Sequence, residues 1–498
     1  MKLKQLLVIP FISMFLVGCD PNASLPDYQK VDTIYTFTDF AKYSGYMSVS
    51  PSLGESKLLV IPVWFTDSSD FIANKENVRN DIETAYIGTS EETGWESVCS
   101  YYAKDSFGRV SLDATVSSWY ECGKPSSDFY TNGDNTGKLV YDAVKWYKEA
   151  YQVSALTEFD KDQNGYIDGV ILIYAAPDFQ AAGKYSRSNM WAYTSWLGKT
   201  FAPKKNPVPN VFFWASYDFM YSSDKAVART GLSEYANGDT RYCNIDTHTY
   251  IHEMGHVFGA YDYYDYDHVS CAAGGFSMQD LNVGGHDPYS RLALGWVDAL
   301  VPNRTTSITV KPVEEGGEII ILSPNYIGSP FDEYIILELY TPTGLNQFDS
   351  EHLYDNRGPL GPSRAGVRVW HVDGRLISVN TRTYEIDAIV NEAKNPGSSH
   401  FLYHATNNNN GDTASPYGGN AYYNELELIK NDVNEEYSAA TIIDEDSLFY
   451  TGDTFSVKQF RKQFVNGTRL NNKKALGWEV TFDSVTSEGM TVTLIKTA

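Results

Sequence analysis

The segment that most constrains this chain is HEMGHVFGAYD, residues 252–262. His252 and His256 are four residues apart, so a helix places both imidazoles on one face, where they can bind one metal ion. Glu253 lies between them, at the position of the general base in zinc hydrolases. Asp262 follows beyond the expected end of the helix and can supply a third ligand. Three ligands beside a carboxylate that does not bind the metal are typical of a catalytic zinc site.

The residues around this motif predict a helix with a cap at each end. Asp246 or Thr247 can serve as the N-cap, and Gly259 stands where a C-cap glycine would end the helix. Apolar residues at helical spacing predict a buried face made of Ile251, Met254, Val257 and Phe258. The expected helix therefore carries the metal ligands on one face and packs against a core with the other.

A glycine-rich segment, residues 274–296, follows the metal motif and contains Met278. The motif HExxHxxGxxD with a Met-containing turn resembles the metzincin-type zinc peptidases, and more closely the bacterial immune-inhibitor-A-like metallopeptidases. That family's pattern continues with an aspartate, a proline and the letters LGW, which Asp265, Pro288 and residues 294–296 match here. A lone methionine is usually core filler, so Met278 gains its meaning from its position after the motif.

The resemblance covers roughly residues 58–373 and, more loosely, the remaining tail. The matching segments are LLVIPVWFTD (58–67), DSFGRVSL (105–112), FDKDQNGYIDGVILIYA (159–175) and RAGVRVWHVD (364–373). It implies a zincin-like fold and zinc-dependent peptide hydrolysis. The third ligand, Asp262, departs from the all-His metzincin pattern and agrees with the closer family.

The expected chemistry follows from these residues. Zinc held by two imidazoles and the carboxylate of Asp262 would lower the pKa of its bound water. Glu253 would take the proton from that water and pass it to the leaving amine, while Gly255 would keep the helix surface open between the ligands. The oxyanion partner is left open among Tyr263, Tyr264, His286 and Tyr289. Asp265 is the alternative third ligand, in an oxygen-rich cluster with Asp267 and His268.

A second possible metal site lies in the pattern DxDxNGxxD, which copies the first half of a calcium loop. Its candidate ligands are Asp160, Asp162, Asn164 and Asp168. The twelfth position is Ile171 rather than the bidentate glutamate, and a strand is expected to follow, so the segment is not an EF-hand. It is either a calcium site completed by groups from elsewhere or an Asp/Asn turn satisfied by its own backbone hydrogen bonds.

The N-terminus reads as a targeting segment. Lys2 and Lys4 precede an apolar stretch, residues 6–17, that is too short to span a bilayer comfortably. Residues 16–19, LVGC, resemble a bacterial lipobox, so residues 1–19 are expected to be a signal peptide that ends at a lipidated Cys19. The lipid would hold the protein at the bacterial cell surface or the outer face of a membrane. Soluble secretion after an ordinary signal peptide is the alternative.

The net charge bears on the class of binding partner, and the cysteine content bears on possible disulfides. The net charge of −24 argues against a nucleic-acid partner, because a strongly negative surface repels phosphate groups. Four cysteines remain besides Cys19, and an exported chain can pair them in two disulfides. We expect the pairs Cys99–Cys122 and Cys243–Cys271, with reduced, buried thiols as the alternative.

The chain of 498 residues is long enough for two or three domains. Residues 20–54 read as a polar tether, and residues 55–300 as an α+β, zincin-like catalytic domain with a mixed sheet and the active-site helix. Residues 301–498 read as β-rich and sandwich-like, partly continuous with the catalytic unit. His371, in the strand that blurs this boundary, is expected to be a core residue rather than a ligand.

These patterns predict a secreted or surface-anchored zinc endopeptidase that acts on extracellular proteins or peptides. Two other classes are open. The chain could be a catalytically silent surface lipoprotein that binds glycan or protein through its β-rich region, or a structural surface protein stiffened by metals. The intact Glu253 counts against the silent binding protein, because a pure binder does not need a general base.

Overall fold

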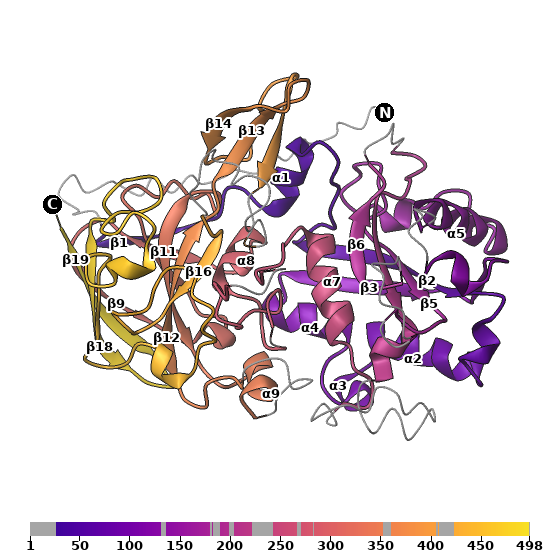
Figure 1. The fold of residues 1–498 in the computed structure, drawn as a ribbon, viewed down its shortest axis with the longest axis horizontal. Coiled ribbons are helices and arrows are strands. Elements are labelled where there is room, and N and C mark those ends of the chain that lie inside the picture. The colour runs from indigo at the N-terminus through magenta and orange to yellow at the C-terminus, as the bar shows by residue number, and fades with distance from the viewer. Residues whose placement is uncertain are drawn as a thin grey trace, which may run out of the picture.

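The computed structural model describes residues 26–130, 136–179, 182, 190–198, 204–221, 243–265, 270–281, 283–351, 360–404, 407 and 423–497. Within these ranges the chain is a mixed α/β structure, which agrees with the predicted α+β class, and its strands form four sheets. Figure 1 shows one half in which helices cover a sheet and a second half made mostly of strands. No helix of the described residues is long and apolar enough to cross a membrane.

The first half is built on the sheet β3-β2-β5-β7-β6. Its strands are β2 (Gly54–Trp64), β3 (Val110–Val116), β5 (Val170–Tyr174), β6 (Tyr193–Trp196) and β7 (Val211–Ser216), and the short β4 (Tyr120–Glu121) pairs with β2. The strands run parallel to one another except β6, which is antiparallel to β7 at the edge of the sheet.

Helices cover both faces of this sheet. One face packs on α2 (Lys75–Ile87), α4 (Val98–Asp105) and α7 (His248–Phe258), and the other on α5 (Thr136–Ala150). Strand β2 reads as a continuous apolar run because its alternate residues enter different cores: Leu58 and Val60 face α7, whereas Leu59 and Ile61 face α5. The short helix α3 (Ser90–Thr93) connects α2 to α4.

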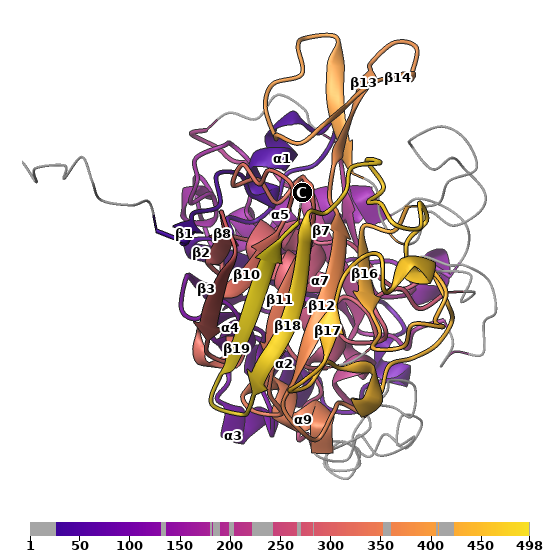
Figure 2. The same cartoon turned by 90° about the vertical axis from the view of Figure 1, so that its left-hand side faces the viewer.

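The second half is β-rich, as predicted, and two of its sheets pack face to face. One has the order β1-β8-β10-β11-β12-β16 and the other β17-β18-β19-β9, with an apolar core between them (Figure 2). Their strands are β1 (Tyr28–Val31), β8 (Ala299–Pro302), β9 (Thr306–Val310), β10 (Ile319–Leu322), β11 (Glu333–Tyr340), β12 (Gly366–Asp373), β16 (Leu426–Ile429), β17 (Thr454–Phe455), β18 (Trp478–Val485) and β19 (Met490–Lys496).

The remaining sheet has the order β14-β13-β15, with strands β13 (Leu376–Asn380), β14 (Ile386–Val390) and β15 (His400–His404). The hairpin of β13 and β14 projects from the body of the protein beside α1 (Phe37–Tyr43) in Figure 1. Two further helices, α8 (Pro288–Ala293) and α9 (Leu345–Glu351), lie where the two halves meet.

The structure corrects the expected tether over its described part, residues 26–54. Strand β1 pairs antiparallel with β8, and Phe37 and Phe40 of α1 are buried in the main core. The Trp296 indole donates a hydrogen bond of 2.8 Å to the carbonyl of Ser52. Prolines interrupt the pattern of this segment, but Phe37 and Phe40 are 0 % and 1 % exposed and anchor it in the main core.

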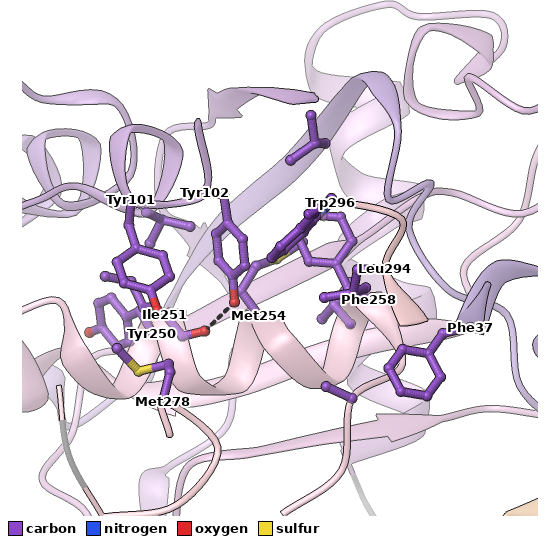
Figure 3. Packing of buried hydrophobic residues seen from close by; sticks show 14 of the residues in the cluster. Phe37, Tyr101, Tyr102, Tyr250, Ile251, Met254, Phe258, Met278, Leu294 and Trp296 are labelled. Atoms are coloured by element: carbon purple, nitrogen blue, oxygen red, sulfur yellow. Dashed lines mark hydrogen bonds between the residues drawn. The ribbon is translucent and has the colours of Figure 1, made fainter. Parts of the chain in front are cut away.

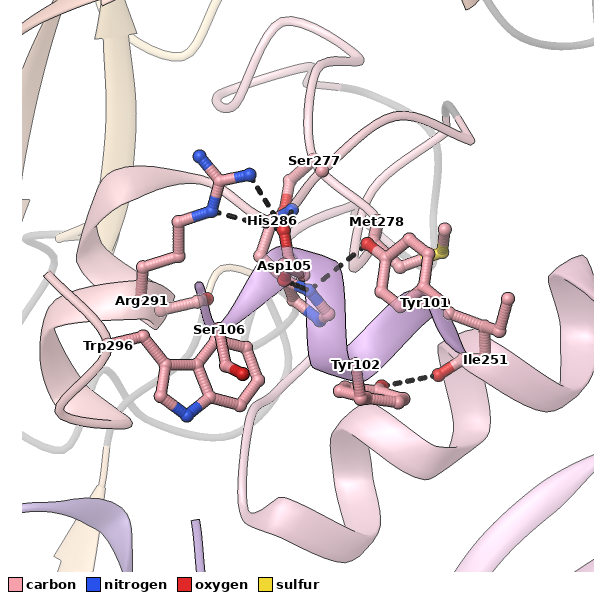
Figure 4. Close-up of polar contacts among 12 residues, drawn as sticks. Tyr101, Tyr102, Asp105, Ser106, Ile251, Ser277, Met278, His286, Arg291 and Trp296 are labelled. Carbon is pink, nitrogen blue, oxygen red and sulfur yellow. Dashed lines mark hydrogen bonds and ion pairs between the residues drawn. The ribbon is translucent and has the colours of Figure 1, made fainter. Parts of the chain in front are cut away.

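The expected boundary at residues 300 and 301 falls inside β8, and one continuous core contains residues from both sides of it. A buried ionic network centred on Arg291 and Asp105 (Figure 4) extends across this boundary to Glu314. The Arg291 guanidinium binds Asp105 at 2.7 Å and Glu314 at 3.0 Å, and the His286 ring lies 2.7 Å from Asp105. The β-rich region is therefore packed as part of the same unit.

The predicted disulfides are wrong: all four described cysteines are thiols. Closeness along the sequence does not bring two Cβ atoms to the separation that a disulfide requires. Burial raises the pKa of the Cys99 thiol, and also that of the Cys271 thiol, to about 12.

Candidate metal centre

Helix α7 begins and ends where the sequence predicts. At its start, a carboxylate oxygen of Asp246 accepts a hydrogen bond from the amide of His248 at 3.0 Å, while Thr247 stands at the N-cap position. At its end, Gly259 adopts φ 103°, a left-handed conformation that favours glycine. The predicted apolar face is buried in the main core (Figure 3), with Ile251, Met254, Val257 and Phe258 all 0 % exposed.

The structure brings the three predicted zinc ligands together. Oδ1 of Asp262 lies 3.0 Å from Nε2 of His252 and 3.1 Å from Nε2 of His256. One ligand atom from each of the three residues lies within 4.8 Å of the others, so a single ion can contact all three. Among the described residues, the donors that converge are two imidazole nitrogens and one carboxylate oxygen. This set fits zinc and would leave one of its four coordination positions open.

Backbone carbonyls fix the orientation of both imidazole rings. Nδ1 of His252 lies 2.8 Å from the carbonyl oxygen of Met278, and Nδ1 of His256 lies 2.8 Å from that of Ala260. A carbonyl only accepts, so each Nδ1 carries the proton and each Nε2 is directed toward Asp262. Such hydrogen bonds are the usual second layer of a metal site, because they set the tautomer of each ligand.

The three side chains are electrostatically coupled. Burial by itself would raise the pKa of Asp262, but the neighbouring His256 and His252 lower it far below its ordinary range. Burial by itself would lower the pKa of His256, but the Asp262 carboxylate overrides this and raises it to about 9. The carboxylate is thus held ionised between the rings, in the state that binds a cation.

Glu253 is 6 % exposed and is not one of the three converging groups. Burial raises the pKa of Glu253, although His256 and His252 act in the opposite direction. The raised pKa favours proton uptake by this carboxylate. The hydroxyl of Thr194 in the edge strand β6 lies 3.1 Å from the Glu253 carboxylate and 2.9 Å from its backbone carbonyl. Strand β6 therefore orients the candidate base.

Met278 is 0 % exposed and belongs to the same apolar cluster as Ile251 and Met254 (Figure 3). The next residue, Gln279, explains the need for Gly255. A Cβ at Gly255 would lie 2.3 Å from Oε1 of Gln279, whose amide nitrogen is 3.3 Å from Nδ1 of His256. Gly255 thus makes room for a side chain beside a ligand rather than leaving an open surface.

The alternative third ligand, Asp265, is outside the converging group. Its carboxylate accepts hydrogen bonds from Ser270, at 3.0 Å from the amide and 3.3 Å from the hydroxyl. The geometry therefore favours Asp262. Asp267 and His268, which complete the expected oxygen-rich cluster, lie outside the described residues, as does Cys19.

The four oxyanion candidates divide into two groups. Tyr263, His286 and Tyr289 are buried, and their polar atoms contact Ser290, Asp105 and His404, respectively, within the core. Tyr264 is only partly buried, and its ring stacks on that of His252, with 6.2 Å between centroids. His371 is a core residue, as expected, and its Nε2 lies 3.0 Å from Glu333.

The Asp-rich loop brings Asp160, Asp162 and Asp168 together, with one carboxylate oxygen of each within 4.8 Å of the others. Asn164 closes the turn, because its Oδ1 accepts a hydrogen bond of 2.7 Å from the amide of Tyr166. Burial, reinforced by the two neighbouring carboxylates, raises the pKa of Asp168 to about 8. The strand expected after the loop is β5.

Several residues of the site escaped the sequence analysis. Thr194 is 59 residues from Glu253, too far along the chain for a local pattern to connect them. The contacts of Met278 and Ala260 are made by backbone carbonyls, which every residue has, so residue type does not reveal them. Gln279 is the one residue of this group that the sequence could have indicated, because it directly follows Met278.

Comparison of the sequence with models of known protein families finds no match, and neither does comparison with curated proteins. The family resemblance thus remains a prediction that depends on the motifs of this chain.

Proposed function

We propose that this protein is a zinc-dependent endopeptidase with a zincin-like catalytic unit. The observation that carries the proposal is the convergence of His252, His256 and Asp262 on one point beside Glu253. Bound there, zinc would polarise the scissile carbonyl and increase the acidity of the attacking water. An open three-ligand site with an adjacent carboxylate is what such a hydrolase needs, whereas a structural zinc site closes with a fourth protein ligand.

The chain's own residues supply the remaining steps. The Glu253 carboxylate accepts a proton from water and later donates it to the leaving amine, and its raised pKa suits both transfers. Thr194 holds this carboxylate through a hydrogen bond from β6. Among the four oxyanion candidates, we propose Tyr264, because it is the one that is partly exposed and lies against a ligand ring.

The substrates we propose are extracellular proteins or peptides, reached from a surface location through a lipid on Cys19. Replacement of Cys19 by serine should release the protein from the membrane fraction and abolish the incorporation of labelled lipid. Continued lipid incorporation in Cys19→Ser would contradict this anchor, and soluble secretion of the unchanged protein would favour the ordinary signal peptide.

Removal and return of zinc test the peptidase directly. The purified protein should cleave casein, lose this activity after treatment with a zinc chelator, and regain it with about one equivalent of zinc per chain. Activity that survives complete zinc removal would contradict the proposal. If the zinc-loaded protein bound casein or glycan without any cleavage, the silent binding protein would be the better description.

A further inference from the structure

The Asp-rich loop brings three carboxyl groups together, two of them buried. Asp160 and Asp168 are 3 % and 2 % exposed, and Asp162, which is exposed, lies within the same 4.8 Å group. Among the described residues, no lysine or arginine forms an ion pair with any of the three. Buried charges of one sign are costly unless a counter-charge lies beside them.

One oxygen of this cluster has no hydrogen-bond partner. Oδ1 of Asp168 is buried and unpaired, whereas Oδ2 accepts hydrogen bonds from the Ser56 hydroxyl at 3.2 Å and from the amide of Lys161 at 3.1 Å. Buried polar atoms in folded proteins nearly always have a partner, so an exception calls for a ligand.

We propose that Asp160, Asp162 and Asp168 bind a calcium ion that stabilises the end of helix α7. The donors are all oxygens, which suit a hard cation and not zinc, and calcium tolerates the irregular geometry of such loops better than magnesium does. Ile171, at the place of the EF-hand glutamate, is buried in β5, so backbone carbonyls and water complete the coordination.

A chain of hydrogen bonds links the loop to α7. The Ser56 hydroxyl that contacts Asp168 also lies 2.8 Å from the hydroxyl of Ser50, and the amide of Ser50 donates to the carbonyl of Val257 at 2.9 Å. Val257 directly follows His256. An ion that fixes Asp168 therefore fixes the partners of the last turn of α7.

Direct packing gives a second link. Gly169 follows Asp168, and a Cβ there would lie 2.9 Å from a methyl group of Leu58 and 3.4 Å from a methyl group of Val257. The backbone at the end of the loop is thus pressed against the same turn of α7. The proposal of a calcium site does not depend on the proposed zinc chemistry. Only the expected benefit of calcium binding to catalysis rests on the proposed function.

Calcium binding is tested by titrating calcium chloride into the metal-free protein in a calorimeter. The unchanged protein should bind about one calcium ion, and a hundredfold excess over the dissociation constant should raise the unfolding midpoint by about 3–5 °C. Asp168→Asn should fold with the same midpoint in EGTA but lose both effects. Asp70→Asn, a change of charge at an exposed residue outside the cluster, is the control and should bind like the unchanged protein.

Absence of calcium binding at millimolar concentration, or equal binding by Asp168→Asn, would overturn the site. Neither readout involves zinc or cleavage, so the site is judged separately from the peptidase.

Hydrogen exchange tests the link to α7. In the metal-free protein, calcium should slow amide exchange in peptides from residues 248–259 by about fivefold or more, with a smaller change in α2. Ser56→Ala should keep calcium binding but lose most of this slowing. Equal slowing in Ser56→Ala and the unchanged protein, or none in either, would overturn the link.

Discussion

The carbonyl oxygen of Met278 lies 2.8 Å from Nδ1 of His252, so the contact of this methionine with the metal centre is made by its backbone. The side chain is fully buried among apolar residues beneath α7. The hydrogen bond sets the tautomer of His252 and leaves Nε2 to face Asp262. Position in the chain, rather than the thioether, is therefore what the site requires of residue 278.

Met278→Leu should for this reason be mild. The exchange conserves volume, so it should cost less than about 1.5 kcal/mol of stability, and the backbone hydrogen bond should persist. Zinc affinity, measured by competition with a chelating indicator, should stay within about threefold of the unchanged protein. A loss of tenfold or more with an unchanged unfolding midpoint would show that the thioether itself matters.

Thr194 gives a sharper test of how the base is oriented. Thr194→Val removes the hydroxyl that contacts Glu253 at 3.1 Å but keeps the shape of the side chain. Loss of one hydrogen bond to a charged group should lower kcat about tenfold or more, with little change in KM or zinc content. Thr194→Ser should restore most of the rate. If Val and Ser variants behave alike, the hydroxyl has no part in orienting Glu253.

The choice of the third ligand can be tested without any substrate. Asp262→Ala removes a converging carboxylate and should weaken zinc binding by at least about 100-fold. Asp265→Ala removes a carboxylate that serves Ser270, so zinc affinity should change by less than about tenfold. Equilibrium competition for zinc distinguishes the two, and the reverse order would make Asp265 the ligand.

The sequence could predict the parts of this site that a single helix and its flanks determine. The sequence predicts the helix and the ligand pair from the four-residue spacing of His252 and His256, and the end of the helix from Gly259. Asp262 could be predicted as well, because it lies only six residues beyond His256.

Contacts between distant elements could not be predicted in this way. The role of Thr194 depends on β6 lying beside α7. The pairing of residues 28–31 depends on β8, which is more than 260 residues away in the sequence. Proline and polar residues made residues 26–54 look like a tether, whereas the buried side chains of Phe37 and Phe40 hold this segment against the core. Likewise, spacing alone suggested disulfides that the tertiary structure does not form.

The buried network around Arg291 makes stability depend on acid pH. Burial alone would raise the pKa of Asp105, but Arg291 and His286 outweigh it and lower the pKa from 3.8 to about 2. A folded-state pKa below the unfolded value means that this carboxylate stabilises the fold above about pH 4. The contribution, about 2 kcal/mol, is lost as the pH falls toward 2.

Urea unfolding of the metal-free protein between pH 2 and pH 6 measures this contribution. Asp105→Asn should be less stable at pH 6, because it leaves Arg291 short of a counter-charge, and its stability should fall less steeply below pH 4. Parallel pH profiles for the two proteins would exclude Asp105 as a source of the acid sensitivity.

The central claim is that Glu253 acts as the base beside a zinc ion that it does not hold. It is tested most directly by casein cleavage and zinc content in Glu253→Gln, with Glu91→Gln, an exposed glutamate outside the site, as the control. We predict that all three proteins hold about one zinc ion per chain, and that Glu253→Gln cleaves at least about a hundredfold more slowly than the other two. A zinc-loaded Glu253→Gln that cleaves as fast as the unchanged protein would contradict the account.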